Sequence, residues 1–384
     1  MINFTFQCPT EIIFGKDTQK LVGEKTRQFG KKTLLVYGGG SIKRTGLYDQ
    51  VTGSLREAGV EFLELGGVQP NPRLALVQQG IELCRRENIG FLLAVGGGSA
   101  IDTAKAIAIG VNYDGDVWDL FLGAQSGHEA LPIGVVLTIP AAGSETSLSI
   151  VITKEEGLVK KGLSDNRIRP KFSILNPELT YTLPFYQTAC GVSDMLAHVM
   201  ERYFTQTAHT DVSDRMCEGV MRSILRIAPQ LKERPNDYDL RADIMWTGTL
   251  AHNGVLGQGR EEDWGSHGIE HELSAIYDIA HGAGLSIVFP AWMKYVYREN
   301  IGKFLQFAVR VMDVDWNFGE PEAMILEAIR RLEAFYRSLD LPVRLSEAGI
   351  DSGRFEEMAA KCAPRGHFKV LDKNDIIKIY QLAQ

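Results

Sequence analysis

The sequence predicts two domains of different class: an α/β domain with a parallel sheet in residues 1–184, and an all-helical domain in residues 185–384. The first half repeats an apolar run, a glycine turn and a helical pattern, which is typical of a parallel sheet with helices on both faces. From about Tyr186 onward, apolar residues recur at helical spacing, as at Ile224, Ile227 and Leu231. Leu183-Pro184 stands where the pattern changes and marks the predicted boundary.

The strands expected in the first half are uninterrupted apolar runs, because strands of a parallel sheet are buried on both faces. They are residues 32–37, 60–65, 90–95 and 133–139. Helical patterns follow the first three runs, ending near Ala58, near Arg86 and near Ala108. Pro70 and Pro72 break the chain after the second strand.

Composition narrows the class of protein. A chain of 384 residues with 45% hydrophobic and 23% charged residues is typical of an ordinary globular protein of two domains. A net charge of -7 without a long basic run argues against a nucleic-acid partner. No signal peptide and no apolar stretch of the ~20 residues needed to span a membrane are expected. The cysteines are scattered, as in a reduced cytoplasmic protein, at Cys8, Cys84, Cys190, Cys217 and Cys362.

Two glycine turns follow predicted strands. The glycine turn 96–99 opens a helix that carries Asp102 in its first turn. Glycines there let the backbone approach a phosphate, and the helix N-terminus favours negative charge. Ile101 stands where the usual dinucleotide fingerprint has its third glycine, so that fingerprint fails. A strand-to-helix turn without any ligand remains the alternative for this motif.

The other glycine turn, 38–41, strengthens the hypothesis of a nucleotide site, because open parallel sheets bind ligands beyond the carboxyl ends of their strands. Gly39, Gly40 and Ser41 put no carboxylate at this tip, and Lys43 and Arg44 follow directly. Small residues and nearby cations suit a 2′-phosphate, so the turn favours NADP(H) over NAD(H). A solvated start of a helix is the alternative for the two cations.

Three of the eight histidines lie within fifteen residues, at His267, His271 and His281. His267 and His271 are four apart and share one face of a helix. On an unbroken helix His281 would lie roughly 21 Å from His267, too far for one metal ion. If the two share an ion, the chain must turn between them, and Tyr277-Asp278 followed by a glycine-rich stretch offers that turn.

A second pair, Asp194 and His198, is also spaced four apart. One carboxylate and several imidazoles form an N/O site suited to Zn²⁺ or Fe²⁺. By itself, Asp194 also fits a charge near a helix N-terminus. His267, Glu270 and His271 match in addition the H-x-x-E-H pattern of zinc peptidases, which would leave the glycine turns unexplained.

Taken together, these motifs resemble those of the iron-containing (group III) alcohol dehydrogenases. Within that family the chain is most similar to the NAD(P)H-dependent butanol dehydrogenase branch, also called broad-range aldehyde reductases. The similarity runs from Phe14-Gly15 to about Pro342. The residues that carry it are 96–99 with Asp102 and Lys105, 140–145, Asp194 with His198, and His267 with His271 and His281.

The resemblance implies an N-terminal dinucleotide-binding domain, a C-terminal helical domain and a catalytic metal, Fe²⁺ or Zn²⁺, in the cleft between them. The metal ligands it implies are Asp194, His198, His267 and His281, with His271 as a proton relay. It places the cofactor contacts at Gly39, Gly40, Ser41, Gly97, Gly98, Ser99, Asp102, Thr138 and Lys160. NAD-restricted members often carry an acidic residue where this chain has Gly39-Gly40, which again favours NADP(H). A homodimer is the family expectation.

The expected function is therefore hydride transfer between NAD(P)H and a small alcohol/aldehyde pair of short to medium chain, such as butanol and butanal. The metal would polarise the substrate oxygen, and the nicotinamide would carry the hydride. Two other hypotheses stay open at this point. One is a zinc metallopeptidase that uses residues 267–271, and the other is a non-catalytic nucleotide-binding protein with structural histidines.

Overall fold

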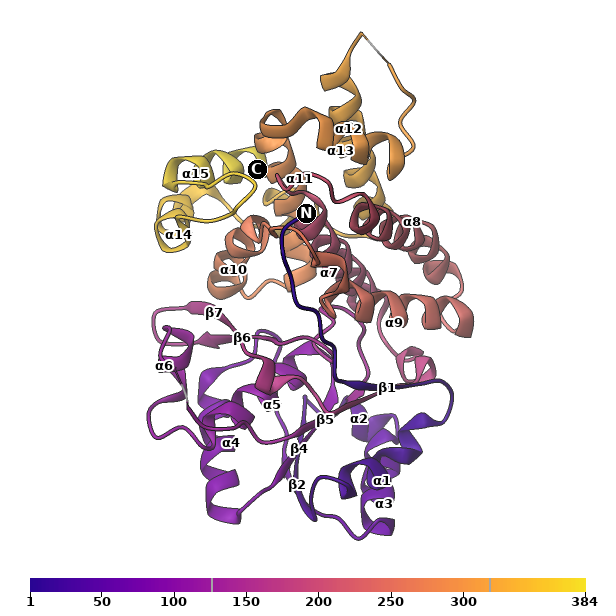
Figure 1. Cartoon of the computed structure of the whole chain (residues 1–384), viewed down its shortest axis with the longest axis vertical. Helices are drawn as coiled ribbons and strands as arrows, with labels where there is room; N and C mark the ends of the chain where they lie inside the picture. The colour runs from indigo at the N-terminus through magenta and orange to yellow at the C-terminus, as the bar shows by residue number, and fades with distance from the viewer. Residues whose placement is uncertain (126, 318) are drawn as a thin grey trace. The chain divides into compact units, whose positions relative to one another are not determined.

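The computed structural model describes residues 1–125, 127–317 and 319–384, which form two compact units (Figure 1). The α/β unit consists of Gln7–Leu183 and Asn236–Thr249, and the helical unit consists of Met1–Phe6, Pro184–Pro235 and Leu250–Gln384. One division of the chain falls between Leu183 and Pro184. The segment Asn236–Thr249 lies far along the chain and nevertheless belongs to the α/β unit.

A six-stranded parallel sheet with the strand order β1-β8-β5-β4-β2-β3 forms the centre of the α/β unit. A separate antiparallel pair joins β6 to β7. The strands are β1 (Glu11–Phe14), β2 (Lys32–Tyr37), β3 (Glu61–Leu65), β4 (Phe91–Gly96), β5 (Ile133–Leu137), β6 (Ser149–Lys154), β7 (Val159–Ser164) and β8 (Phe172–Leu175). The sheet confirms the predicted parallel α/β architecture.

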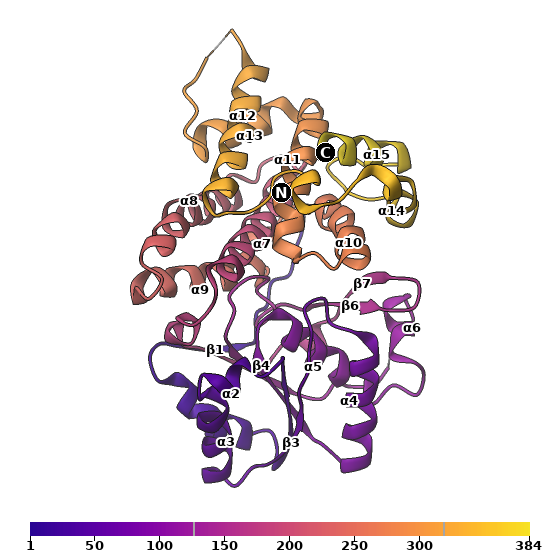
Figure 2. The ribbon, with the colours of Figure 1, turned by 180° about the vertical axis from the view of Figure 1, so that it is seen from behind.

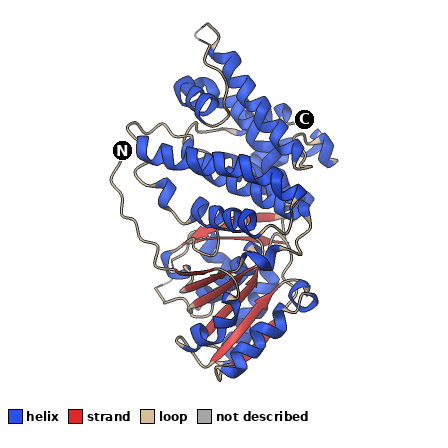
Figure 3. Ribbon diagram, turned by 90° about the vertical axis from the view of Figure 1, so that its right-hand side faces the viewer, coloured by secondary structure: helices blue, strands red, loops and turns tan. Residues whose placement is uncertain are grey.

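Helices cover both faces of this sheet (Figure 3). Side chains of a strand alternate between faces, so Leu34 and Val36 face α4 and α5, while Leu35 and Tyr37 face α1 and α3. Each face is buried in its own apolar core. The helices of this part of the chain are α1 (Val22–Arg27), α2 (Ser41–Arg44), α3 (Leu47–Glu57), α4 (Leu74–Glu87), α5 (Gly98–Gly110) and α6 (Val117–Phe121).

The helical unit is built around α11, which packs against α7, α10, α13 and α15 (Figure 2). Every residue of α11 from Gly282 to Met293 is buried, as expected for a central helix. The remaining helices of the chain are α7 (Phe185–Tyr203), α8 (Asp211–Glu233), α9 (Tyr238–His252), α10 (Gly265–Tyr277), α11 (His281–Val296), α12 (Ile301–Arg310), α13 (Pro321–Ser338), α14 (Phe355–Cys362) and α15 (Lys373–Leu382). Each helix described in the three ranges above is too short or too polar to span a lipid bilayer.

The chain turns between α10 and α11, as the histidine spacing requires. Asp278 follows α10 with φ +52°, in the left-handed region, and His281 is the first residue of α11. The glycines play a different part from the one expected. A Cβ on Gly282 would fall on the backbone carbonyl of Cys190 in α7, and one on Gly284 would meet the Glu270 side chain. These glycines therefore let α11 approach α7 and α10 closely.

Candidate metal centre and cofactor site

Asp194, His267 and His281 form a compact group inside the helical unit. They come from α7, α10 and α11, and their ligand atoms all lie within 4.8 Å of one another. Asp194 Oδ1 lies 3.9 Å from His267 Nε2 and 3.8 Å from His281 Nε2. Two ligands bonded to one ion at ~2.1 Å stand roughly 3–3.5 Å apart, so a small contraction would bring these three atoms to one metal.

The other ring nitrogen of these two histidines is held by a buried carboxylate. His267 Nδ1 lies 2.7 Å from Glu201 Oε1, and His281 Nδ1 is hydrogen-bonded to Glu270 Oε2. Glu201 and Glu270 are fully buried. A carboxylate at Nδ1 fixes the tautomer and directs the Nε2 lone pair toward a metal. These two glutamates are functional candidates. The motif spacing did not indicate Glu201, and it indicated Glu270 only as part of the zinc-peptidase pattern.

His267 Nε2 is buried and has no hydrogen bond among the described residues. Asp194 Oδ1 is also buried, and its near neighbour is His198 Nδ1, which lies 2.9 Å away and points chiefly to the Asp194 carbonyl oxygen. A buried polar atom without a partner costs free energy, which a bound cation would recover. Burial lowers the pKa of His267 well below its usual value, so the ring is neutral, the form that binds metals. Burial acts to raise the pKa of Asp194, but His198, His281 and His267 outweigh it and lower that pKa. The group therefore fits a divalent cation.

His198, the fourth predicted ligand, stands next to this group. Its ring centroid lies 4.6 Å from that of His267. Its Nδ1 lies 2.8 Å from the Asp194 carbonyl oxygen and 2.9 Å from Asp194 Oδ1. An Nδ1–H that donates to the carbonyl leaves Nε2 as the available ligand atom. Arg202 donates to the His198 carbonyl and lies over the Trp264 ring, which buttresses this end of α7.

His271, the predicted relay, is half-buried, with its ring 5.5 Å from that of His281. It forms a second group with Glu270 and His281 whose ligand atoms lie within 4.8 Å of one another. In the buried group, the histidines beside Asp194 are His267 and His281. A zinc peptidase of the H-x-x-E-H type would instead need His267 and His271 to bind the same metal ion. Glu270 is fully buried against His281 Nδ1 and Ser274, which removes it from contact with a substrate.

The cofactor residues of the α/β unit gather at one edge of the sheet. Gly39, Gly40 and Ser41 follow β2, Gly97 and Gly98 follow β4, and Thr138 follows β5. These strands are parallel neighbours in the order β5-β4-β2, so their carboxyl ends lie side by side. From β2 the chain continues to β3 on one side, and from β4 to β5 on the other, so the two glycine turns flank the topological switch point where such sheets bind ligands.

The glycine turns are open where a nucleotide would need room. A Cβ on Gly39 or Gly40 would meet nothing within 4 Å, and Gly40 adopts φ +97°, which favours glycine. Gly97 differs, because a Cβ there would meet the Ile139 side chain. Ser99 lies in the first turn of α5, next to the free N–H groups of that helix.

Charged side chains are buried under the glycine turn 96–99. Asp102 accepts hydrogen bonds from Ser144 Oγ (2.6 Å) and the Val151 amide (2.9 Å). Lys105 Nζ donates to Ser144 Oγ (3.0 Å) and to the Ser147 carbonyl (2.9 Å). Burial raises the pKa of Asp102 and lowers that of Lys105 to about 8. This network holds Asp102 in place below Ser99.

Lys160 is placed on β7, where its Nζ donates to Asn71 Oδ1 at 2.9 Å. It is buried, and its charge helps to lower the pKa of Asp102 against the opposing effect of burial. Asp102 and Lys160 are therefore close enough to interact. Their predicted contacts with the cofactor stay a prediction.

The expectation of a tip without an acidic residue is corrected at the glycine turn 38–41. Glu64, near the end of β3, lies 3.2 Å from Lys43 Nζ through its Oε2. The same oxygen accepts a hydrogen bond from Tyr37 (2.7 Å). The carboxylate comes from a neighbouring strand, and nothing in the spacing of the glycine turn indicates it. Arg44 is exposed.

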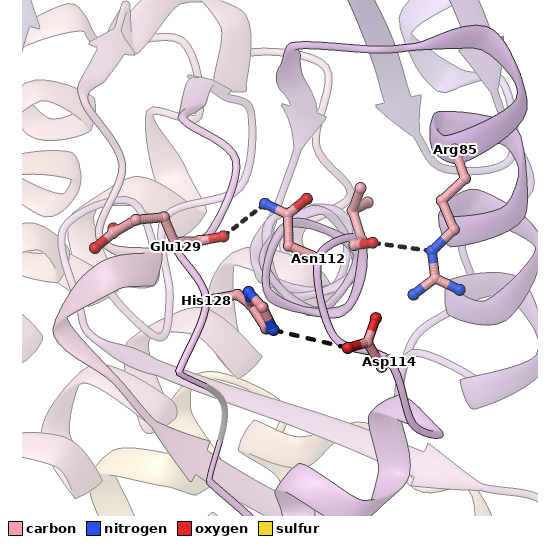
Figure 4. A pocket seen from close by; sticks show the side chains of 6 residues that line it. Arg85, Asn112, Asp114, His128 and Glu129 are labelled. Atoms are coloured by element: carbon pink, nitrogen blue, oxygen red, sulfur yellow. Dashed lines mark hydrogen bonds and ion pairs between the residues drawn. The ribbon is translucent and has the colours of Figure 1, made fainter.

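A surface pocket of ≈ 450 Å³ lies elsewhere on the α/β unit (Figure 4). Asn112 donates to the Glu129 carbonyl (2.7 Å), Arg85 donates to the Val111 carbonyl (2.9 Å), and His128 lies 3.8 Å from Asp114. These residues pair with one another. None of the predicted cofactor or metal residues lines this pocket, so it is separate from the candidate site.

Comparisons with known proteins agree over the whole chain. Residues 9–177 match the family described as "Iron-containing alcohol dehydrogenase". Residues 188–384 match "Fe-containing alcohol dehydrogenase family, C-terminal". The chain is 46% identical to the "Probable NADH-dependent butanol dehydrogenase 2" of Bacillus subtilis (strain 168), over 99% of both chains. It is 35% identical to the "NADPH-dependent aldehyde reductase YqhD" of Escherichia coli (strain K12), over 100% of both.

Solved structures give the same result. The crystal structure of an NADH-dependent butanol dehydrogenase A from Thermotoga maritima superposes with a TM-score of 0.96. That protein is 41% identical, and the match covers 100% of this chain and 99% of the other.

Proposed function

The chain belongs to the iron-containing alcohol dehydrogenase family, and from that premise we propose that it transfers hydride between NAD(P)H and a short- to medium-chain alcohol/aldehyde pair. The names of its relatives support such a substrate, since they are butanol dehydrogenases and aldehyde reductases. The peptidase hypothesis receives no support from them.

The observation that carries the proposal is the buried His267 Nε2, which has no hydrogen bond among the described residues and lies with His281 Nε2 beside the same oxygen of Asp194. With His198 these residues would hold one divalent metal. Three imidazoles and one carboxylate without sulfur suit Fe²⁺ or Zn²⁺. A cation there supplies Lewis-acid chemistry toward the substrate oxygen, and the nicotinamide supplies the hydride.

The chain's own residues keep the ligands in the right form. Glu201 holds the Nδ1 proton of His267, and Glu270 that of His281, so both rings present Nε2. His271 is half-buried beside His281, and we assign it to carry a proton between the substrate oxygen and water. An imidazole suits this task because its ordinary pKa lies near neutrality.

At the glycine turns, backbone N–H groups and the hydroxyls of Ser41 and Ser99 would bind the cofactor phosphates. A preference for NADP(H) over NAD(H) is part of the proposal, supported by Gly39-Gly40, Ser41 and the exposed Arg44. We expect the preference to be small, because Lys43 is paired with Glu64.

One experiment tests the proposal. Purified protein should oxidise NADPH in the presence of butanal, lose that activity on chelation and regain it with added Fe²⁺ or Zn²⁺. Metal analysis should find about one ion per chain. Activity that survives complete removal of the metal would contradict the metal mechanism. Binding of nucleotide without turnover of any aldehyde would favour the non-catalytic alternative.

The cytoplasmic location and the homodimer stay predictions. The dimer is tested by light scattering of the purified chain, where a mass near 42.6 kDa would contradict it.

A further inference from the structure

Glu64 stands beside the glycine turn at which the cofactor's adenosine ribose is expected to lie. It is the last residue but one of β3, and the parallel register places Leu35 opposite Glu64 and Val36 opposite Leu65. The turn 38–41 starts directly after β2. Glu64 is therefore an acidic residue at this edge of the sheet, although it lies more than twenty residues beyond the turn in the sequence.

The carboxylate of Glu64 is held from three sides. Tyr37 donates to its Oε2 at 2.7 Å, Tyr48 donates to its Oε1 at 2.5 Å, and Lys43 Nζ lies 3.2 Å from Oε2. Lys43 in turn lies over both tyrosine rings, 5.1 Å from the Tyr37 centroid and 4.6 Å from the Tyr48 centroid. The Lys43 side chain is 48% exposed and that of Glu64 34%, so a ligand can reach the pair.

The charges of the two groups respond to this arrangement. Hydrogen bonds with Tyr37 and Glu64 raise the pKa of Lys43 above its usual value. Burial acts to raise the pKa of Glu64, but the hydrogen bonds from Tyr48, Tyr37 and Lys43 lower it. Lys43 and Glu64 are thus both charged near neutral pH, and their charges offset each other.

This pair affects the two nicotinamide cofactors differently. A 2′-phosphate carries about two negative charges and needs an available cation, whereas the 2′-hydroxyl of NADH is neutral. Lys43 can bind that phosphate only by sharing its charge with Glu64, and Glu64 repels the phosphate directly. We propose that Glu64 is a specificity-determining residue, which limits the preference for NADP(H) by engaging Lys43. This inference rests on the proposed function, in which the cofactor binds at this turn.

Glu64→Gln tests the inference, because it keeps the shape and an acceptor oxygen but removes the charge. The dissociation constants of NADPH and NADH are measured by isothermal titration calorimetry, which does not depend on turnover. We expect the ratio of NADPH to NADH affinity to rise about ten-fold or more, since a charge-assisted contact to phosphate is gained. A purely structural effect would change both affinities alike.

Two further variants make the test specific. In a Lys43→Met background, Glu64→Gln should change the affinity ratio much less, because the freed cation is absent. Glu87→Gln is the matched control. Glu87 forms an ion pair at 3.3 Å with Lys32, which begins β2 at the end away from the glycine turn. The control therefore removes a comparable ion pair and changes the net charge by the same amount as Glu64→Gln. This control should leave the ratio within about two-fold of that of the unmodified protein.

The outcomes separate this inference from the proposed function. An unchanged ratio in Glu64→Gln, with both cofactors still bound, overturns the role of Glu64 alone. An equal rise in the Lys43→Met background overturns the part assigned to Lys43. If the unmodified protein binds neither cofactor, the cofactor site and this inference fail together.

Discussion

At the scale of single residues, each histidine of the candidate metal centre uses one ring nitrogen to hold its position. His267 and His281 face carboxylates through Nδ1, and His198 faces a backbone carbonyl. The Nε2 atoms of His267 and His281 then lie near the same oxygen of Asp194. A ring without such a partner would be free to rotate, and the site would lose its shape.

His267 and His271 share one helix but should differ when replaced. His267→Ala should abolish metal retention, because His267 supplies one of the atoms nearest to Asp194 Oδ1. His271→Ala should retain the metal and lower kcat by about 10²–10⁴-fold with a shifted pH profile. Metal analysis and steady-state kinetics of both variants decide this. A metal-free His271→Ala together with a metal-loaded His281→Ala would contradict the assignment.

The glutamates behind the histidines should tune metal affinity without touching the metal. Glu201→Gln removes the charge that faces His267 Nδ1, and we expect the affinity for Zn²⁺ to fall about 10–100-fold. Competition with a chromophoric chelator measures this. Glu218→Gln is the control, because Glu218 is also buried in the helical unit but binds Tyr203 and Arg310. Equal losses in both variants would show a general effect on stability.

The buried charges under the glycine turn 96–99 give a prediction about stability and pH. Lys105→Met removes the cation of Glu145 and the stronger of the two cations that act on Asp102, and it should lower the free energy of unfolding by about 3–5 kcal/mol. Burial raises the pKa of both carboxyls above their ordinary 3.8 and 4.5. The cost of ionising them appears only as the pH rises above those ordinary values, so the loss should be larger at about pH 8 than at about pH 5.

Urea unfolding at both pH values measures this loss. Lys161→Met, on the exposed side of β7, serves as the control and should stay within about 0.5 kcal/mol. A loss for Lys105→Met that is independent of pH would show that packing, not charge, is responsible.

At the scale of elements, replacing a glycine by alanine in two helices of the helical unit should have opposite effects on stability. Gly282→Ala would place a Cβ on the Cys190 carbonyl, push α11 from α7 and cost about 1–3 kcal/mol. It should also weaken metal binding, since His281 and Asp194 lie on these two helices. Gly219→Ala in α8 meets nothing within 4 Å and should stabilise by about 0.5–1 kcal/mol. Thermal unfolding and metal titration compare them, and equal effects would contradict the close approach of the helices.

Elements with a strong local pattern could be predicted from the sequence. Residues 32–37 are the observed β2, and 60–65, 90–95 and 133–139 differ from β3, β4 and β5 by one or two residues at their ends. The strands β1 and β8 were missed, because they are only four residues long and pair with each other across more than 150 residues. The hairpin β6-β7 was missed as well, since β7 carries Lys160, Lys161 and Gly162 in place of an apolar run.

The residues of the candidate site likewise fall into those that the sequence predicted and those that it did not. Spacings of four residues on a helix predicted the pairs Asp194–His198 and His267–His271, and the turn after Tyr277 was anticipated. Glu201 and Glu64 could not be found by spacing, because their roles depend on contacts with residues far along the chain. Tertiary contacts of this kind leave no periodic signal in the sequence.

At the scale of the whole molecule, the candidate metal ligands all belong to the helical unit, and the candidate cofactor residues all belong to the α/β unit. Loss of the metal should therefore leave cofactor binding in place. We expect His267→Ala to bind NADPH with a dissociation constant within about three-fold of the unmodified protein while turnover is lost. Calorimetry and kinetics on the same sample test this. A large loss of NADPH affinity would show that the two sites are coupled.

The path of the chain has a consequence for biosynthesis. Met245 lies in the core of the α/β unit, and Thr249 donates a 2.6 Å hydrogen bond to the buried carboxylate of Glu145. At about 5–20 residues per second, a ribosome delivers Thr249 roughly 3–13 s after Leu183. Through that interval the nascent α/β unit lacks the core side chain of Met245 and the hydrogen bond that Thr249 donates to the Glu145 carboxylate. The α/β unit therefore cannot complete its fold until residues 236–249 have been synthesised, and chaperones can bind it during this interval.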